Sequence, residues 1–329
     1  MKKLLGLILV ATLAACSKQK DETSFFATSM QEIRVQIPRS RSTVQARDFE
    51  NKLNSLELLV FNDEGKKVIS RKVEKDEIDA GEFSIGVSKS MAQRQCTIYA
   101  IANSKDVDAT LKDEMDALVE DDFASYQGNY DMVLAKALRP RGFSMSDRQE
   151  ITLCKTGEVT YVNLSLRRTV ARIELRLQVS EAFASKYPGK ITPKKAEFGN
   201  GAVKSFLIKS EVPFASAFNA SHTQFCGISE GQWNNLFYAY ERSDTTPETL
   251  PYIKIYADYD NDGNSQTEDD ISQMEYKLLL GENGQGIIKR NTTYAIDASI
   301  TGLEGDELLC DIQIAQWDEA PKEELEIGK

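Results

Sequence analysis

Apolar and polar residues alternate at every second position in many short stretches of this chain. The clearest stretch is 171–179, where Ala, Ile, Leu and Val at odd positions alternate with Arg, Glu and Gln at even positions. A strand with this period has one buried face and one solvated face, as in an antiparallel sheet that is covered on one side. The pattern therefore predicts β-structure.

Further stretches of the same kind extend this prediction along the chain. They are 55–61, 82–87, 96–102, 159–166, 236–241, 252–259, 273–280, 293–300 and 311–317. Turn residues such as Asp262-Gly263 separate them. Helical spacing occurs at 107–126 and at 180–187, where Ser180 is the expected N-cap.

Many short strands with few helices favour β-sandwiches over a doubly wound fold. We therefore expect an all-β protein with few short helices. The chain has 329 residues, so two tandem antiparallel sandwiches are more economical than one. The boundary is expected within the segment 166–170, between two strong strand patterns.

The net charge of −11 removes one class of partner. Nucleic-acid binding needs a surplus of Lys and Arg to neutralise phosphates, and this chain has the opposite balance. We therefore expect no nucleic-acid partner.

The first residues predict export. Lys2 and Lys3 precede an apolar run of ten residues, 4–13, which is too short to span a bilayer and is typical of a signal peptide. The run ends Leu-Ala-Ala-Cys16, which resembles a bacterial lipobox in which Cys16 is lipidated. The alternative is an ordinary signal peptide with a coincidental Cys. The lipid would be the only membrane contact, because no later segment is long and apolar enough to cross.

The remaining cysteines predict no metal site. No CxxC motif occurs, and the single histidine, His222, cannot supply a ligand cluster. Two disulfides are conceivable in an oxidising compartment. Buried free thiols are the other expected state. The candidate pairs are Cys96–Cys154 and Cys226–Cys310.

One acidic loop has the composition of a calcium site. Asp258, Asp260 and Asp262 alternate before Gly263, and Asp269 stands where a calcium loop usually has Glu. The flanks predict strands, so this is no EF-hand. The alternative is an acidic hairpin tip, since Asp and Asn favour turns. We expect no cofactor apart from a structural calcium ion at this loop.

Catalytic signatures are missing from the sequence. One histidine excludes most His-dependent triads, and neither a Gly-rich phosphate loop nor a GxSxG motif occurs. Aromatic residues at 237–240 and 252–259 raise the alternative of a surface glycan-binding lipoprotein. Because they lie in strand patterns, core packing is the stronger interpretation. We expect a non-enzymatic protein.

A short strand precedes a cluster of arginines near the N-terminus. Ile33, Val35 and Ile37 alternate with polar residues, and Pro38 ends the run. Arginines then follow within nine residues, at Arg39, Arg41 and Arg47. Alone, these arginines are typical of a solvated loop.

Several motifs in a fixed order resemble the lipoprotein fimbrillins of Bacteroidetes, the FimA-like major fimbrial subunits or type V pilins. The segments CTIYAIAN at 96–103 and RNTTYAIDASI at 290–300 are the most similar. The segment 141–146 lacks the proline of the family pattern. The other matching segments are the lipobox at Cys16, 56–65, 166–175 and 238–241.

This resemblance implies two transthyretin-like sandwiches and an assembly mechanism. An Arg-specific protease would cut after Arg41, with Arg39 and Arg47 as alternatives. The first strand, with Ile33, Val35 and Ile37, would be released, and a strand from the next copy would replace it. The donor would be the C-terminal strand with Ile312, Ile314 and Trp317.

The resemblance also implies an organisation and a location. The expected segments are a signal peptide at 1–15, a removable tether, strand and arginine loop at 16–47, and sandwich domains at 48–167 and 168–329. The chain would reach the cell surface as an outer-membrane lipoprotein precursor that passes through the periplasm and joins a fimbrium for adhesion. Its partners would be copies of itself, accessory fimbrial subunits and the processing protease. The alternative within the family is an anchor or tip subunit that stays acylated.

Overall fold

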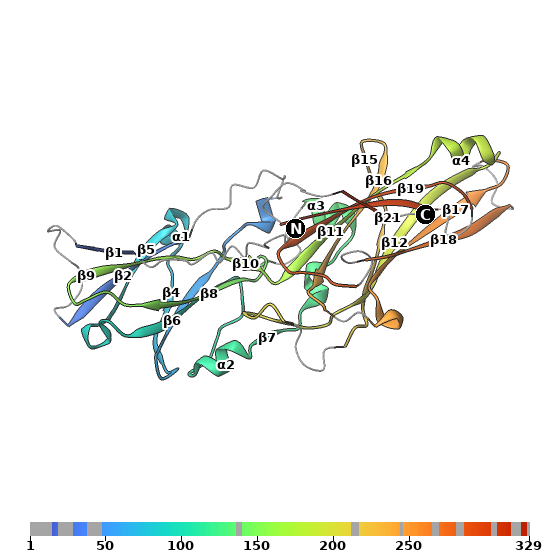
Figure 1. Ribbon diagram of the computed structural model, residues 1–329. Helices are drawn as coiled ribbons and strands as arrows, with labels where there is room; N and C mark the ends of the chain where they lie inside the picture. Colours follow the sequence, from blue (N-terminus) through green and yellow to red (C-terminus); the bar gives the residue numbers. More distant parts are fainter. Residues whose placement is uncertain are drawn as a thin grey trace, which may run out of the picture.

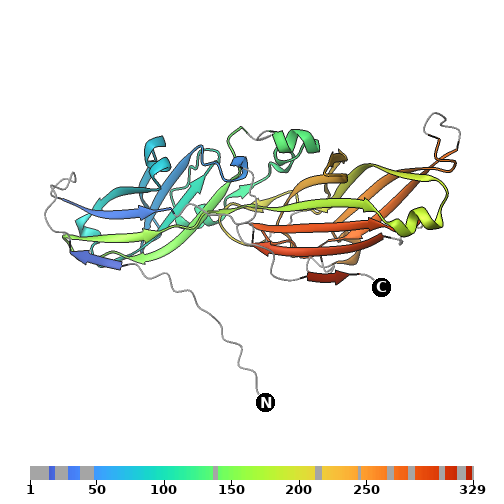
Figure 2. The ribbon, with the colours of Figure 1, turned by 90° about the horizontal axis from the view of Figure 1, so that it is seen from above.

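The computed structural model describes residues 15–18, 29–37, 48–135, 140–211, 217–243, 246–264, 270–280, 286–303, 308–316 and 324–327. Two β-rich parts lie end to end along one long axis (Figures 1 and 2). The first part ends with β10 and the second begins with β11.

The N-terminal part contains two sheets, with strand orders β1-β9-β2-β5 and β10-β8-β6-β3-β4. Inward residues of both sheets, such as Ile33 and Ile98, belong to one hydrophobic cluster, so the sheets pack face to face. The strands are β1 (Ala15–Lys18), β2 (Met30–Gln36), β3 (Leu56–Asn62), β4 (Lys67–Lys72), β5 (Glu82–Ser88), β6 (Gln95–Ala102), β8 (Met145–Thr152), β9 (Glu158–Asn163) and β10 (Arg167–Arg168).

The C-terminal part repeats this architecture with strand orders β15-β16-β11-β19-β20-β21 and β14-β12-β17-β18. Its strands are β11 (Val170–Val179), β12 (Lys190–Gly201), β14 (Ala220–Phe225), β15 (Gly227–Ser229), β16 (Gln232–Tyr240), β17 (Tyr252–Asp260), β18 (Ile271–Leu279), β19 (Thr292–Ile300), β20 (Leu308–Gln316) and β21 (Glu324–Ile327). A small pair, β7 (Val119–Glu120) with β13 (Ser205–Phe206), connects the two parts.

The helices are short. They are α1 (Lys75–Ala80), α2 (Lys112–Asp116), α3 (Tyr130–Ala135) and α4 (Glu181–Lys186), with 3₁₀ turns η1 (Asp48–Glu50), η2 (Lys89–Met91), η3 (Phe123–Tyr126) and η4 (Pro247–Thr249). The Ser180 hydroxyl accepts the Phe183 N–H and caps α4, as the sequence predicts. The expected helix at 107–126 is instead broken into α2, β7 and η3, so that prediction is wrong in extent.

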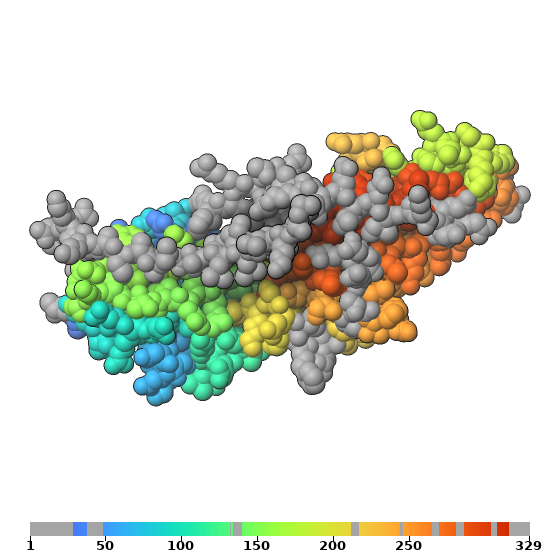
Figure 3. Space-filling view, viewed as in Figure 1, coloured from blue at the N-terminus to red at the C-terminus, as the bar shows by residue number. Residues whose placement is uncertain are grey.

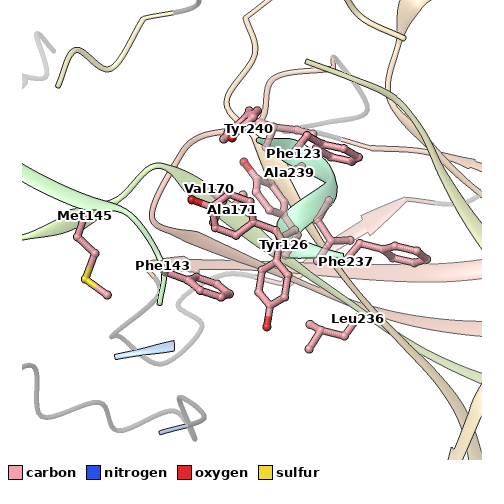
Figure 4. Packing of buried hydrophobic residues seen from close by; sticks show 14 of the residues in the cluster. Phe123, Tyr126, Phe143, Met145, Val170, Ala171, Leu236, Phe237, Ala239 and Tyr240 are labelled. Atoms are coloured by element: carbon pink, nitrogen blue, oxygen red, sulfur yellow. The ribbon is translucent and has the colours of Figure 1, made fainter. Parts of the chain in front are cut away.

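An aromatic cluster joins the two parts (Figure 4). The ring of Phe143, which precedes β8, lies 5.1 Å from Tyr126 and 4.8 Å from Tyr238 of β16, both edge to face. Such pairs add about 0.5–1.5 kcal/mol beyond their buried area. The surfaces of the two parts meet without a break in the space-filling view (Figure 3). The hydrophobic core is therefore continuous through the junction.

The expected all-β class with few short helices is confirmed, since strands dominate both parts. The strand predicted at 171–179 is β11, which pairs antiparallel with β16 and parallel with β19. The domain boundary expected within 166–170 and the domain limits at 48–167 and 168–329 stay predictions.

Candidate functional site

Strand β2 lies in the interior of its sheet, between β5 and β9. It pairs antiparallel with β5 over seven residues, from Met30 opposite Ser88 to Gln36 opposite Glu82. It pairs parallel with β9, where Ile33 lies opposite Thr160. The Ile37 N–H donates to the Gly81 carbonyl at 2.9 Å and extends the ladder beyond the strand. β2 is therefore paired with β5 along its whole length and with β9 over Ile33–Gln36.

The predicted inward residues of this strand lie in the core. Ile33 and Val35 are each 0% exposed, and Ile37 is also buried. On β5 the side chains of Phe83 and Ile85 are buried beside them. On β9 the side chain of Val162, opposite Val35, is buried as well, so removing β2 would expose apolar side chains on both sides of the vacated position.

The outward face of β2 carries charges. Arg34 and Glu32 form an ion pair at 3.0 Å, and the Ser84 hydroxyl of β5 donates to Glu32 at 2.5 Å. The Arg34 guanidinium also lies 5.7 Å from the ring centroid of Tyr161 on β9. These contacts are partly exposed, so they contribute little to holding β2.

A cavity of about 350 Å³ lies at the C-terminal end of β2. Apolar side chains make up much of its lining, which also includes the charged residues Lys52, Lys75, Asp79 and Arg168. The apolar side chains in this lining are Ile37, Leu53, Leu56, Ile78, Phe83, Met145 and Leu166.

The arginine segment follows at once. Arg39, Arg41 and Arg47 lie outside the described residues. The chain is described again from residue 48, in the turn η1. The candidate cleavage positions therefore stand between two described segments, β2 and η1.

Glu50, the last residue of η1, is held by the C-terminal part. It is 0% exposed, and its carboxylate accepts from Arg172 Nη1 at 2.8 Å and from the Tyr238 hydroxyl at 2.7 Å. Arg168 Nε donates to the Glu50 carbonyl at 3.1 Å. The same guanidinium donates through Nη1 to Asn291 Oδ1 at 3.0 Å. This buried group, which we call the Glu50 anchor (Glu50, Arg168, Arg172, Tyr238), was not predicted from the sequence.

The predicted donor residues lie partly in β20. This strand pairs antiparallel with β19 over nine residues and with the four-residue β21 on its other side. Ile312 is fully buried, and Ile314 packs against the core. Trp317 lies outside the described residues. The strand predicted to be donated is thus docked on its own sheet here.

Cys16 lies in the four-residue strand β1, opposite Thr160 of β9. Its side chain lies outside the described part of the structure. None of the described helices combines the length and the hydropathy that crossing a bilayer requires.

The acidic loop differs from the predicted calcium set. The carboxylates of Asp260, Asp262 and Asp270 come within 4.8 Å of one another. Asp258 instead faces Lys194 at 3.5 Å, and Asp269 lies outside the described residues. The carboxylates accept backbone N–H groups: Gly263 donates to Asp260, Asn264 to Asp262 and Asp262 to Asp270. Hydrogen bonds of this kind are typical of an acidic hairpin tip, which is the alternative to a calcium site that the sequence allows.

The two candidate disulfides are not formed. Cys96, Cys226 and Cys310 are free thiols, and Cys154 is disulfide-bonded to a partner outside the described side chains. Burial raises the pKa of Cys96, Cys226 and Cys310 to about 12. The pairings Cys96–Cys154 and Cys226–Cys310 were therefore wrong.

The candidate glycan-binding aromatics divide into two groups. Phe237, Tyr238 and Tyr240 are buried in the junction cluster, as core packing predicts. Tyr252 and Tyr256 lie half-buried on β17, and their hydroxyls donate to the two carboxylate oxygens of Glu197 at 2.7 and 2.8 Å. Only this second pair faces outward.

Two face-to-face sheets in each part, with an apolar N-terminal strand in the interior of one sheet, define a fold of bacterial surface fimbrial and adhesion proteins. The structure is similar to a fimbrilin (FimA) from Porphyromonas gingivalis, with a TM-score of 0.61 and 16% identity over 89% of this chain and 99% of that one. It is also similar to the tip fimbrial protein Mfa3 from the same organism, with a TM-score of 0.57 and 16% identity over 88% of this chain and 100% of that one. At these identities the likeness shows the fold.

A protein-family model matches part of the sequence. Residues 33–165 match the family model of the major fimbrial subunit protein (FimA). No curated protein matches the sequence. The predicted resemblance to fimbrillins is confirmed, and the matched family is one of structural fimbrial subunits, not of enzymes.

Proposed function

We propose that this chain is a stalk subunit of a cell-surface fimbrium that polymerises by exchanging β2 for a strand of the next copy. It would be exported as a lipoprotein through Cys16 and cut after Arg41, or after Arg39 or Arg47. The observation that carries the proposal is the position of β2: an interior strand with a fully buried face, directly before the arginine segment.

The driving force follows from the burial of β2. Its loss would leave two unpaired strand edges and a row of apolar positions in water, which is strongly unfavourable. Three inward residues contribute about 1.5–3 kcal/mol each when fully buried. A strand added from another copy would restore the hydrogen bonds and the apolar contacts together.

The C-terminal strand β20 is the proposed donor. Its apolar face contains Ile312 and Ile314, and it lies one strand from the end of its sheet, closed off by only the four residues of β21. In the fibre this strand would leave β19 and enter the position that β2 vacates. The removed piece would be 16–47, and the retained sandwich domains would be 48–167 and 168–329.

Lipidation has a consequence for Cys154. A lipidated Cys16 has no sulfur available for a disulfide, and Cys96, Cys226 and Cys310 are free thiols. Cys154 would then have no disulfide partner within the chain. The lipoprotein would therefore carry Cys154 as a thiol. The cut subunit would lose Cys16 and its lipid, while an anchor subunit would keep both.

The test is to replace Arg39, Arg41 and Arg47 together by Gln and to expose the protein to limiting amounts of an Arg-specific protease. We expect the unchanged protein to yield a mature start at Ser42 by mass spectrometry and fibres by electron microscopy, and the variant to yield neither. Arg94→Gln, at an exposed position, is the matched control and should assemble normally. Normal fibres from the triple variant would refute the proposal, and retained acyl-Cys16 on assembled protein would favour the anchor role.

A further inference from the structure

One inward position of β2 is not apolar. Gln31 precedes Ile33 and Val35 on the same face and is 4% exposed. Both of its amide atoms, Nε2 and Oε1, are buried and have no hydrogen-bond partner among the residues that the structure describes. Its cross-strand neighbour is Val87, which is itself buried in the core. The side-chain amide is therefore shielded from solvent and lies beside an apolar residue of β5.

Such a group weakens the strand that carries it. A buried donor or acceptor that makes no hydrogen bond loses its hydration without compensation. The other inward residues of β2 that the structure describes are apolar, so Gln31 is the one polar side chain on its buried face. An apolar side chain of the same size at this position would bind the same groove more tightly.

The apolar face of the proposed donor strand carries no such defect, since the buried, unpaired Asp311 Oδ1 of β20 lies at an alternate position on the other face. The face of β20 with the same two-residue spacing consists of Leu308, Cys310, Ile312 and Ile314, and all four pack in or against the core. β20 therefore presents four apolar side chains, whether it enters the groove parallel or antiparallel to the direction of β2. At the corresponding positions β2 presents Gln31, Ile33, Val35 and Ile37. The exchange would replace a buried amide by an apolar group.

We propose that Gln31 weakens the binding of β2 to its groove. The groove would then bind the apolar donor strand of a second copy more tightly than the chain's own β2. This inference depends on the proposed strand exchange. While the chain is intact, β2 is held at the high effective concentration of an intramolecular segment, which masks the defect. A cut in segment 38–47 removes that advantage, and the unpaired amide then favours departure of β2.

The test uses Gln31→Met, which keeps the length of the side chain and removes its amide. Gln36→Met is the matched control, because Gln36 lies on the same strand but is exposed and donates to Glu82. Each protein is cut with the Arg-specific protease in the presence of excess synthetic peptide 308–316. The half-time of β2 release is followed by mass spectrometry, and fibre growth by light scattering.

We expect Gln31→Met to raise the urea midpoint of the uncut protein and, after cutting, to lengthen β2 release and slow fibre growth by roughly tenfold or more. Gln36→Met should match the unchanged protein in all three readouts. If the unchanged protein releases β2 and assembles but Gln31→Met does so at the same rate, the role of Gln31 is refuted and strand exchange stands. If the unchanged protein releases no β2 at all, both proposals are overturned.

Discussion

The two segments that flank the arginines are held in different ways. Before them, β2 is held by backbone ladders and apolar side chains, and its charged contacts lie on a partly exposed face. After them, Glu50 is held by buried bonds to Arg172 and Tyr238, which belong to the C-terminal part. Apolar contacts and ladders are the interactions that any apolar strand can replace. A charge anchored to one buried arginine has no such substitute. The difference separates a removable segment from a retained one.

The largest effect on stability is expected from a change at the buried face of β2. Val35→Asp places a carboxylate at a position with no exposed surface, and we expect it to lower the free energy of unfolding by about 4 kcal/mol or more. Met30→Asp, at an exposed position of the same strand, should change it far less. Urea unfolding measures both. Equal effects would show that β2 is not docked as described.

The second prediction concerns the Glu50 anchor. Glu50→Ala removes the buried carboxylate that lies 2.8 Å from Arg172 and leaves this guanidinium with Glu174 at 3.5 Å, so we expect a loss of about 3 kcal/mol in the free energy of unfolding. Glu64→Gln, which removes an exposed ion pair with Lys66, is the control and should have no measurable effect. A cut chain with Glu50→Ala should also expose more of its junction to hydrogen exchange. An unchanged stability would mean that the anchor does not hold the retained segment.

Part of this comparison is readable in the sequence and part is not. The alternation at 33, 35 and 37 predicts an inward face because a strand has a period of two. Strand β12 was missed because Pro193 and several lysines interrupt its pattern, and the structure accommodates the proline beside a register shift. The Glu50 anchor was missed because Glu50 and Arg172 are 122 residues apart, and no local period connects them. Gln31 is visible as a polar residue at an inward position, but its lack of a partner requires the structure.

The cysteines provide a third prediction, on the product of cutting. The cut subunit, which has lost Cys16, should contain four thiols: Cys96, Cys154, Cys226 and Cys310. Burial raises the pKa of Cys96 to about 12, so the folded protein should react with a thiol reagent at pH 8 at least tenfold more slowly than the unfolded protein. The pKa of Cys96 in the folded protein lies above its unfolded value of 9.0. The stability that the buried, protonated Cys96 thiol contributes is therefore fully present below pH 9 and is lost as the pH rises towards 12.

A thiol titration in denaturant measures the count, with the uncut protein as the reference. Fewer than four thiols in the cut subunit would show a disulfide within the retained chain.

The smallest effect is expected at the acidic loop. The carboxylates of Asp260 and Asp262 already accept backbone N–H groups, so we expect calcium and a chelator to leave the melting temperature unchanged. Asp270→Asn should remove any shift that does occur, while Asp258→Asn should not, because Asp258 faces Lys194. A clear rise in melting temperature with calcium would establish the loop as a metal site.

The most direct test of strand exchange is a reversible lock on β2. Arg34 and Ser84 lie directly opposite each other on β2 and β5, so Arg34→Cys with Ser84→Cys places two thiols at cross-strand positions. Oxidised protein should be cut by the protease but keep β2 and form no fibres, and a reductant added afterwards should start assembly. Fibres that grow equally well from the oxidised, locked and cut protein would contradict the claim that β2 must leave.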